Sequence, residues 1–282
     1  GLMIPPSLTL IVYGVSINES IIKLFMAGIM PGLVLASLFM SYIVAWHFFR
    51  PGQRPEPEPP ISFGTMLAES RFLIPVLCLV FAVIGSMYFG WATATEAAAV
   101  GVIGALVLSI FQRSLTMATF FESLMGATRT SAMIALILMG AAFLSLSMGF
   151  TGLPRALAAF IDQMNLSPIT LIVALTVFYI ILGMFLDGIS SVVLTMAIVE
   201  PMIRQAGIDP IWFGIFIVVV VEMAQVTPPI GFNLFVLQGM TRHEIGYISK
   251  VALPMVALML VMVVLLVAFP GLATWLPENI RQ

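Results

Sequence analysis

Long runs of apolar residues alternate with short polar interruptions along the chain. A transmembrane helix needs about 20 mostly apolar residues, and these stretches meet that length: Ile21–Phe49, Phe72–Gly90, Trp91–Phe111, Thr130–Gly149 and Val251–Pro270. Apolar and polar residues do not alternate as they do in membrane β-strands, so helices are favoured over a β-barrel. The pattern predicts an all-α polytopic membrane protein.

Two further apolar stretches, Pro168–Ile203 and Ile211–Gly239, are interrupted. In the first, an apolar segment runs to Phe185, the sequence LDGISS (Leu186–Ser191) breaks it, and Val192–Ile203 is apolar again. The carboxylate of Asp187 is costly at membrane depth, and the adjacent Gly188 weakens the helix. Because two full crossings here would conflict with the distribution of positive charges, we predict a re-entrant hairpin.

A Pro-Pro motif occurs twice, in Ile4–Gly14 (IPPSLTLIVYG) and Thr227–Leu237 (TPPIGFNLFVL), and each copy is followed at the same distance by Pro31 or Pro254. Paired prolines remove backbone donors and force the preceding residue out of a helix. Lipid tolerates this only where the backbone lines a cavity or meets an ion. We therefore predict two broken helices, with ordinary proline kinks as the alternative.

Positive residues determine the predicted topology. The positive-inside rule places the proline-rich linker Arg50–Pro60, together with Arg113 and Arg242, in the cytoplasm. Ser114–Thr128 carries apolar residues on one helical face and is predicted to be an interfacial helix that lies on the membrane or along neighbouring helices. With these loops fixed, the two Pro-Pro helices cross in opposite directions. Inverted repeats with broken helices are typical of secondary transporters, whose sites lie at the breaks.

Composition supports the membrane interpretation. Of the 282 residues, 61% are hydrophobic and only 9% are charged, whereas soluble domains carry about 25% charged residues. The formal net charge of −2 gives no electrostatic basis for binding nucleic acid. The single cysteine excludes a disulfide framework within the chain.

Several motifs occur together in the chain: Gly183–Leu194 (GMFLDGISSVVL), Gly207–Gly214 (GIDPIWFG), Glu222–Phe235 (EMAQVTPPIGFNLF), Thr95–Gly101 (TEAAAVG) and Ile4–Gly14. In combination they resemble the large membrane subunit of TRAP (tripartite ATP-independent periplasmic) transporters, over essentially the whole chain. The family has an earlier hairpin, so the chain resembles the C-terminal two-thirds of such a subunit and is not expected to transport alone. Two departures are Ala197, where the family more often has proline, and Gln225, in a position that is usually apolar.

The resemblance implies an inverted-repeat, elevator-type fold in the bacterial inner (cytoplasmic) membrane. It implies sodium-coupled import of a small organic acid, delivered by a periplasmic substrate-binding protein, with a small TRAP membrane subunit as partner. The predicted parts are the end of a first-repeat broken helix (1–20), scaffold helices with the linker (21–129), a second-repeat transport region (130–250, with hairpin 168–203 and broken helix 211–239) and a last span with a tail (251–282).

Sodium is bound by hard oxygens, which are often the backbone carbonyls and hydroxyls that helix breaks supply. One predicted Na+ site combines the hairpin break with the second Pro-Pro break: Asp187, Gly188, Ser190, Ser191, Thr227, Pro228 and Gly231. Half of a second site would consist of Pro5, Pro6 and Ser7. Alternatively, Asp187 caps the return helix of the hairpin.

Two residues are candidates for substrate binding. Asn233, just past the second break, offers an amide, and Arg129 could clamp a carboxylate or simply extend to the membrane surface. Glu96 and Glu222 could relay protons. Alternatively, Glu96 caps its helix and Glu222 bonds to unwound backbone.

Two alternative functions make different demands on the sequence. A binding-protein-independent, ion-coupled carboxylate symporter would need the same helix breaks. An intramembrane enzyme would need a nucleophile and a base at one membrane depth, but His47 and His243 both lie near predicted cytoplasmic ends. The residues alone favour an ion-coupled transporter.

Overall fold

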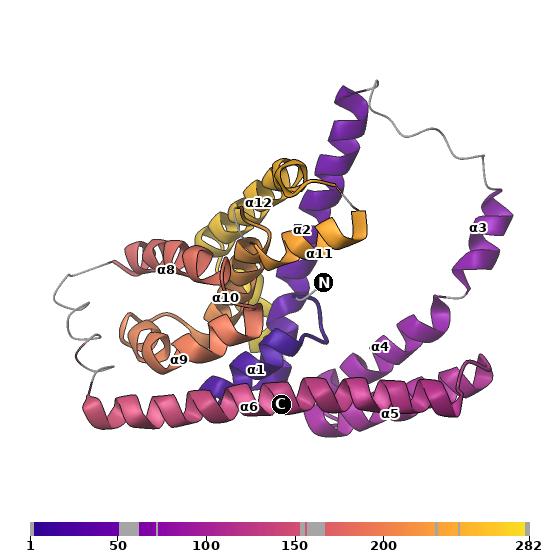
Figure 1. Cartoon of the computed structure of the whole chain (residues 1–282), viewed down its shortest axis with the longest axis horizontal. Coiled ribbons are helices and arrows are strands. Elements are labelled where there is room, and N and C mark those ends of the chain that lie inside the picture. The colour runs from indigo at the N-terminus through magenta and orange to yellow at the C-terminus, as the bar shows by residue number, and fades with distance from the viewer. Residues whose placement is uncertain are drawn as a thin grey trace. The chain divides into compact units, whose positions relative to one another are not determined.

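The computed structural model describes residues 3–50, 62–71, 73–152, 156, 167–228, 231–241 and 243–279. Within these residues every regular element is an α-helix (Figure 1). Contacts divide the chain into two compact units: Gly1–Phe39 with Met133–Ile280 (unit 1), and Met40–Ala132 with Arg281–Gln282 (unit 2). Most of the predicted linker after Arg50, and also Arg242, lie outside the described residues.

Unit 1 is a helical bundle. It contains α1 (Leu8–Ile17), the first part of α2 (Ile21–Phe49), the last part of α6 (Met117–Thr151), α8 (Pro168–Gly183), α9 (Gly188–Gln205), α10 (Pro210–Gln225), α11 (Phe232–Thr241), α12 (Ile245–Ala268) and α13 (Gly271–Glu278). Unit 2 contains the remainder of α2 and α6 with α3 (Phe63–Ser70), α4 (Ile74–Tyr88) and α5 (Ala94–Phe111).

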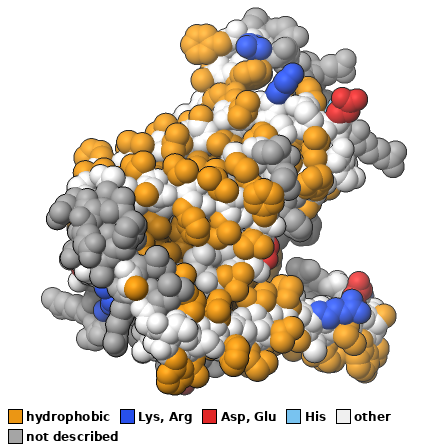
Figure 2. All heavy atoms as spheres, turned by 60° about the vertical axis from the view of Figure 1, so that its left-hand side comes forward, with side chains coloured by type: hydrophobic (Ala, Val, Ile, Leu, Met, Phe, Trp, Pro, Cys, Tyr) orange, Lys and Arg blue, Asp and Glu red, His pale blue; other side chains and the backbone are white. Residues whose placement is uncertain are grey.

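The described helices have the lengths and surfaces of membrane spans. Four of them, α2, α5, α6 and α12, are long and apolar enough to cross a bilayer, and α1, α4, α8 and α10 are shorter apolar helices. Large apolar side chains such as Phe143 (73% exposed) and Phe150 (86%) lie on the surface, and Figure 2 shows apolar side chains over most of the visible face. Soluble monomers rarely expose so much contiguous apolar surface. The chain is an all-α membrane protein with several spans.

The segment Ser114–Thr128, predicted to be an interfacial helix, is not a helix of its own. The helix α6 begins at Met117 and continues through Thr151 as one 35-residue element, which also includes the predicted span Thr130–Gly149. No proline interrupts it, and its internal glycines weaken a helix without ending it. The amphipathic segment is therefore the first part of a long helix.

The centre of unit 1 is α10. Its residues Trp212–Val221 are all buried, as expected for a helix that is apolar on every side. It contacts α1, α8, α9, α11, α12 and α13. Two hydrogen bonds hold its first turn: Trp212 Nε1 donates to Leu266 O (3.1 Å), and Tyr13 Oη donates to Pro210 O (2.7 Å).

The predicted hairpin is present as α8 and α9, joined by the short connection 184–187, and both arms pack against α10. The hydroxyls of Tyr179 and Thr195 lie 2.6 Å apart and join the two arms. Tyr179 is fully buried. Whether the hairpin is re-entrant stays a prediction.

Both Pro-Pro motifs are followed by helices in the same pattern. Each is followed by a 10-residue helix, α1 or α11, and then by a long helix with an internal proline, Pro31 in α2 or Pro254 in α12. The helix α10 ends at Gln225 and α11 begins at Phe232, so the second break is confirmed, although Pro229 lies outside the described residues. The inverted relation between the two copies stays a prediction.

We expect Tyr13→Phe to lower the free energy of unfolding by about 1 kcal/mol, because the carbonyl of Pro210 loses a hydrogen bond inside the bundle. The Tyr13 side chain is fully buried. Thermal unfolding of the detergent-solubilised protein measures the change. The matched control is Tyr247→Phe, which removes the same hydroxyl from a 59%-exposed side chain. Equal stabilities of the two variants would contradict the assigned hydrogen bond.

Candidate functional site

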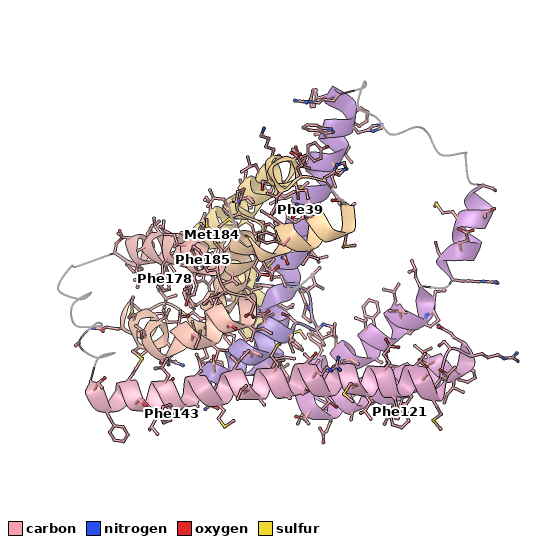
Figure 3. All side chains as sticks on the ribbon, in the orientation of Figure 1. Phe39, Phe121, Phe143, Phe178, Met184 and Phe185 are labelled. Carbon is pink, nitrogen blue, oxygen red and sulfur yellow. The ribbon has the colours of Figure 1, made fainter. Side chains whose placement is uncertain are left out.

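The tip of the hairpin lies against the last turn of α10. A Cβ on Gly183, at the end of α8, would lie 2.6 Å from the Cβ of Ala224. A Cβ on Gly188, at the start of α9, would lie 2.7 Å from Nε2 of Gln225. A side chain at Gly183 would push the tip away from α10, whereas at Gly188 the Gln225 amide would have to move aside. In Figure 3, Met184 and Phe185 lie in the connection between the two arms.

The second break closes tightly around Gly231. A Cβ at this residue would lie 2.5 Å from the carbonyl oxygen of Gln225 and 2.9 Å from that of Thr227. The Thr227 carbonyl accepts the N–H of Gly231 at 3.2 Å, and the Thr227 hydroxyl donates to Met223 O at 2.6 Å. Two backbone carbonyl oxygens thus converge where α10 ends. Gln225 joins this break to the hairpin tip, since its side chain lies against Gly188 and its carbonyl against Gly231.

Asp187 is the N-cap of α9. Its Oδ2 accepts the backbone N–H groups of Ile189 and Ser190, each at 3.1 Å. The capping alternative is therefore what the structure shows for this carboxylate. As a consequence the prediction that the break extends to residue 191 is wrong: the cap lets the helix start at Gly188, so Ser190 and Ser191 lie in its first turns.

Two buried polar side chains near the tip lack partners. Ser191 is fully buried, and its hydroxyl makes no hydrogen bond. Gln225 is 6% exposed, and its amide makes no hydrogen bond to the described residues, but among these residues only Ser191 Oγ is a fully buried polar atom without a partner. A fully buried polar group without a partner costs about 1–3 kcal/mol, so the Ser191 hydroxyl points to a ligand. Sequence reasoning noted Gln225 only as an unusual residue, and a glutamine beside a Pro-Pro motif was the available signal.

Helix dipoles favour a cation at the end of α10. The helices α8 and α10 both end beside the tip, and carbonyl groups at helix C-termini carry partial negative charge. The positive N-terminal end of α9 is already compensated by Asp187. The available atoms are hard and mostly neutral oxygens, which suit a monovalent cation such as Na+.

The first Pro-Pro break packs against α2. Ser7 is buried and caps α1, with its Oγ accepting the N–H of Leu10 at 3.3 Å, whereas Pro5 is buried and Pro6 exposed. A Cβ on Gly28 would lie 2.4 Å from the carbonyl oxygen of Met3. The backbone just before the Pro-Pro pair therefore approaches α2 so closely that only a glycine fits at position 28. A second Na+ site at this position stays a prediction.

The candidate substrate residues lie in different units. Asn233 is half-buried in the first turn of α11, two residues after Gly231. Arg129 is exposed and belongs to unit 2, in the interior of α6. Both substrate roles stay predictions, as does the proposed Na+ ligation by Pro228, which is half-buried in the turn after α10.

The capping alternative is confirmed for Glu96. Its Oε2 accepts the N–H of Thr93 at 2.8 Å, and Thr93 Oγ1 accepts the N–H of Glu96 at 3.3 Å, which completes a capping box. Glu222 is half-buried on α10 and makes no hydrogen bond to the described residues. Its predicted hydrogen bond to unwound backbone stays a prediction, because residues 229–230 of the break lie outside the described residues.

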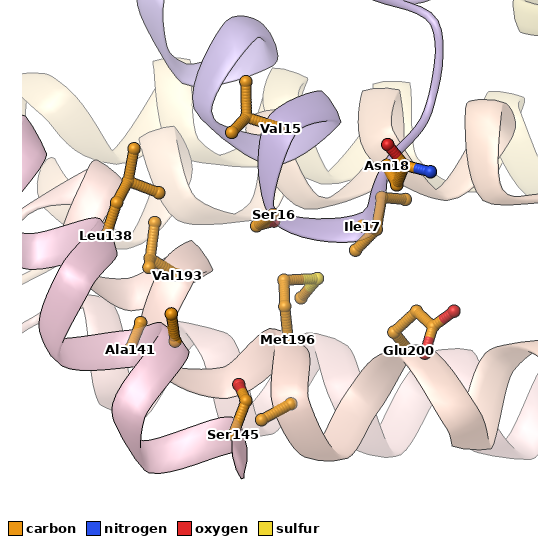
Figure 4. A pocket seen from close by; sticks show the side chains of 12 residues that line it. Val15, Ser16, Ile17, Asn18, Leu138, Ala141, Ser145, Val193, Met196 and Glu200 are labelled. Carbon is orange, nitrogen blue, oxygen red and sulfur yellow. The ribbon is translucent and has the colours of Figure 1, made fainter.

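A separate cavity of about 560 Å³ lies between α1, α6 and α9. Figure 4 shows Met196 and Glu200 of α9 facing the end of α1, where Ile17 and Asn18 lie. The charged side chain in its lining is Glu200. Glu200 forms a salt bridge with Arg204, which forms a second salt bridge with Glu19 at 3.2 Å. A lining whose charged group is a carboxylate does not suit an organic anion, and no predicted site residue lines this cavity.

Many membrane transporters place their sites at broken helices, and here the tip of a hairpin meets such a break. The chain belongs to the DctM family: the family model described as "Tripartite ATP-independent periplasmic transporter, DctM component" matches residues 1–272. This agrees with the resemblance seen in the motifs. The related proteins are transporter permeases, so the family is one of transporters and not of enzymes.

The isethionate TRAP transporter permease protein DctMQ of Oleidesulfovibrio alaskensis is 33% identical, over 96% of this chain and 43% of that protein. The C4-dicarboxylate TRAP transporter large permease protein DctM of Pseudomonas aeruginosa is 30% identical, over 99% of this chain and 65% of that protein. The 2,3-diketo-L-gulonate TRAP transporter large permease protein YiaN of Escherichia coli is 30% identical, over 96% of this chain and 63% of that protein. The chain thus spans less than two thirds of the length of these relatives.

Proposed function

We propose that this chain forms the ion-coupling part of a sodium-driven permease that imports a small organic acid across the bacterial inner membrane. The observation that carries the proposal is the meeting of the hairpin tip and the helix break at the last turn of α10. The converging carbonyls of Gln225 and Thr227, and the buried hydroxyl of Ser191 three residues after Gly188 on α9, are neutral oxygens of the kind that Na+ prefers. Membrane transporters place their ions at such breaks.

The oxygens at the break contribute differently to Na+ binding. The carbonyl of Gln225 accepts no hydrogen bond from the described residues, so it is available to an ion. The carbonyl of Thr227 already accepts one N–H, and its second lone pair is left for the ion. Asp187 uses Oδ2 for its cap, which leaves Oδ1 without a hydrogen bond from the described residues. Ser190, half-buried in the same turn, completes the proposed set from the hairpin.

The substrate class follows from family membership and from local chemistry. The relatives are named for isethionate, C4-dicarboxylates, 2,3-diketo-L-gulonate and sialic acid, all of which are organic acids. Asn233 follows the break by two residues on α11, where its amide can donate to a substrate carboxylate. Sodium at the break lowers the electrostatic cost of bringing an anion to the same place.

The proposed partners are a small TRAP membrane subunit and a periplasmic substrate-binding protein. One relative carries the combined designation DctMQ and matches this chain over 43% of its length, which leaves room for a second subunit in the same polypeptide. In the proposed elevator motion α8, α9, α10 and α11 move as one body, because the tip and the break share the last turn of α10.

Uptake in proteoliposomes tests this function. The permease containing this sequence is reconstituted with the small subunit, supplied with binding protein, and offered radiolabelled organic acids. We expect accumulation with an inward Na+ gradient and none with an equal K+ gradient, since the proposed site is built for a small cation. Equal uptake with both gradients would refute sodium coupling. Uptake without binding protein would instead support a binding-protein-independent symporter.

A further inference from the structure

Gln225 lies at the candidate ion site in two ways. Its carbonyl oxygen would lie 2.5 Å from a Cβ on Gly231, and Nε2 of its side chain would lie 2.7 Å from a Cβ on Gly188. The residue is only 6% exposed. One residue therefore presents a main-chain oxygen to the helix break and a side-chain amide to the hairpin tip.

The amide is placed without a partner in the described structure. It makes no hydrogen bond to the described residues, and the Ser191 hydroxyl, also unpartnered, lies three residues from Gly188 on the same face of α9. A half-turn of the amide about Cγ–Cδ exchanges Nε2 for Oε1 at the same position. The tip then faces a neutral hard oxygen, which is the chemistry of the carbonyls beside it.

We propose that the Gln225 side chain is a further ligand of the coupling cation, through Oε1, and that it sets the affinity and selectivity of this site for Na+. The inference rests on the proposed Na+ site at the break. An apolar side chain of the same length would fill the space but offer no hard oxygen. Because the same side chain lies against Gly188, an ion held by Oε1 also links the hairpin tip to the end of α10.

A packing role for Gln225 makes a different prediction from a ligand role. A packing residue contributes equally with and without sodium, and an isosteric apolar residue replaces it. A ligand contributes only when the ion is bound, so its loss changes the Na+ concentration at which the protein responds. The readout that separates the two roles is the half-saturating Na+ concentration, measured apart from the stability of the sodium-free protein.

The test is thermal unfolding of the purified permease in detergent, titrated with NaCl or LiCl at constant ionic strength set with choline chloride. The variants are Gln225→Met, the matched control Gln238→Met on α11, and Gly231→Ala, which obstructs the break. We expect Gln225→Met to raise the half-saturating Na+ concentration roughly 10- to 100-fold, the scale seen when groups that support a metal site are removed. Gln238→Met should leave this concentration unchanged.

The outcomes separate this inference from the function on which it rests. If the wild-type protein shows no stabilisation by Na+, or if Gly231→Ala responds to Na+ as the wild type does, the proposed ion site itself is wrong. If the wild type responds, Gly231→Ala does not, and Gln225→Met keeps the wild-type half-saturating concentration, only the role of Gln225 is overturned. A lower sodium-free Tm for Gln225→Met with unchanged half-saturation assigns it to packing and likewise overturns the inference.

Discussion

Gly231→Ala is expected to reduce Na+-driven uptake by about a hundredfold or more, the scale that a displacement of about 1 Å causes at a functional centre. The added Cβ would lie 2.5 Å from the carbonyl oxygen of Gln225 and 2.9 Å from that of Thr227. Both are backbone atoms, which cannot rotate away as the end of a flexible side chain can. The break must therefore widen, and the converging carbonyls lose the geometry on which ion binding depends.

Gly239→Ala is the matched control for this prediction. Gly239 lies on the same helix, α11, and a Cβ there meets no atom within 4 Å. Uptake of a radiolabelled organic acid is compared for the two variants at equal protein in the liposome membrane. Wild-type uptake by Gly231→Ala would show that the carbonyls at this break do not hold the coupling ion.

Helices were predictable from the sequence wherever a local signal marks their ends. The predicted span Ile21–Phe49 has the bounds of α2 itself, and the Pro-Pro pair near residue 228 coincides with the gap between α10 and α11. The start of α6 was misjudged because residues 114–130 contain no proline to separate an amphipathic segment from the span that follows. The composition changes along α6, but no residue in this segment ends the helix.

The site was predictable only in part, because its contacts join residues far apart in the chain. Sequence reasoning selected Asp187 and Gly231 from their positions at breaks, since local backbone chemistry is readable from glycine, proline and aspartate. It could not show that Gly183 and Gly188 both lie against the last turn of α10, nor that Gln225 contacts both the hairpin tip and the second Pro-Pro break. Those facts depend on the packing of α8 and α9 against α10, for which no local signal exists.

The strongest test of this packing exchanges a glycine and an alanine across the interface. In Gly183→Ala the new Cβ would lie 2.6 Å from the Cβ of Ala224, so the hairpin must move away from α10. We expect a loss of about 1–3 kcal/mol in the free energy of unfolding, as for other overpacked cores, together with reduced uptake. Ala224→Gly alone should cost about 1 kcal/mol, because glycine is a poorer helix former than alanine.

Combining the two substitutions should rescue the protein. In Gly183→Ala/Ala224→Gly the methyl group has only changed sides, so we expect stability and uptake near those of the wild type and a coupling free energy of about 1–3 kcal/mol between the positions. Thermal unfolding in detergent and Na+-driven uptake measure both effects. The control pair is Gly149→Ala with Ala224→Gly, since a Cβ on Gly149 meets no atom within 4 Å and should show no coupling. If the effects of Gly183→Ala and Ala224→Gly simply add, the hairpin tip does not rest on the last turn of α10, and the joint ion site built on that contact cannot stand.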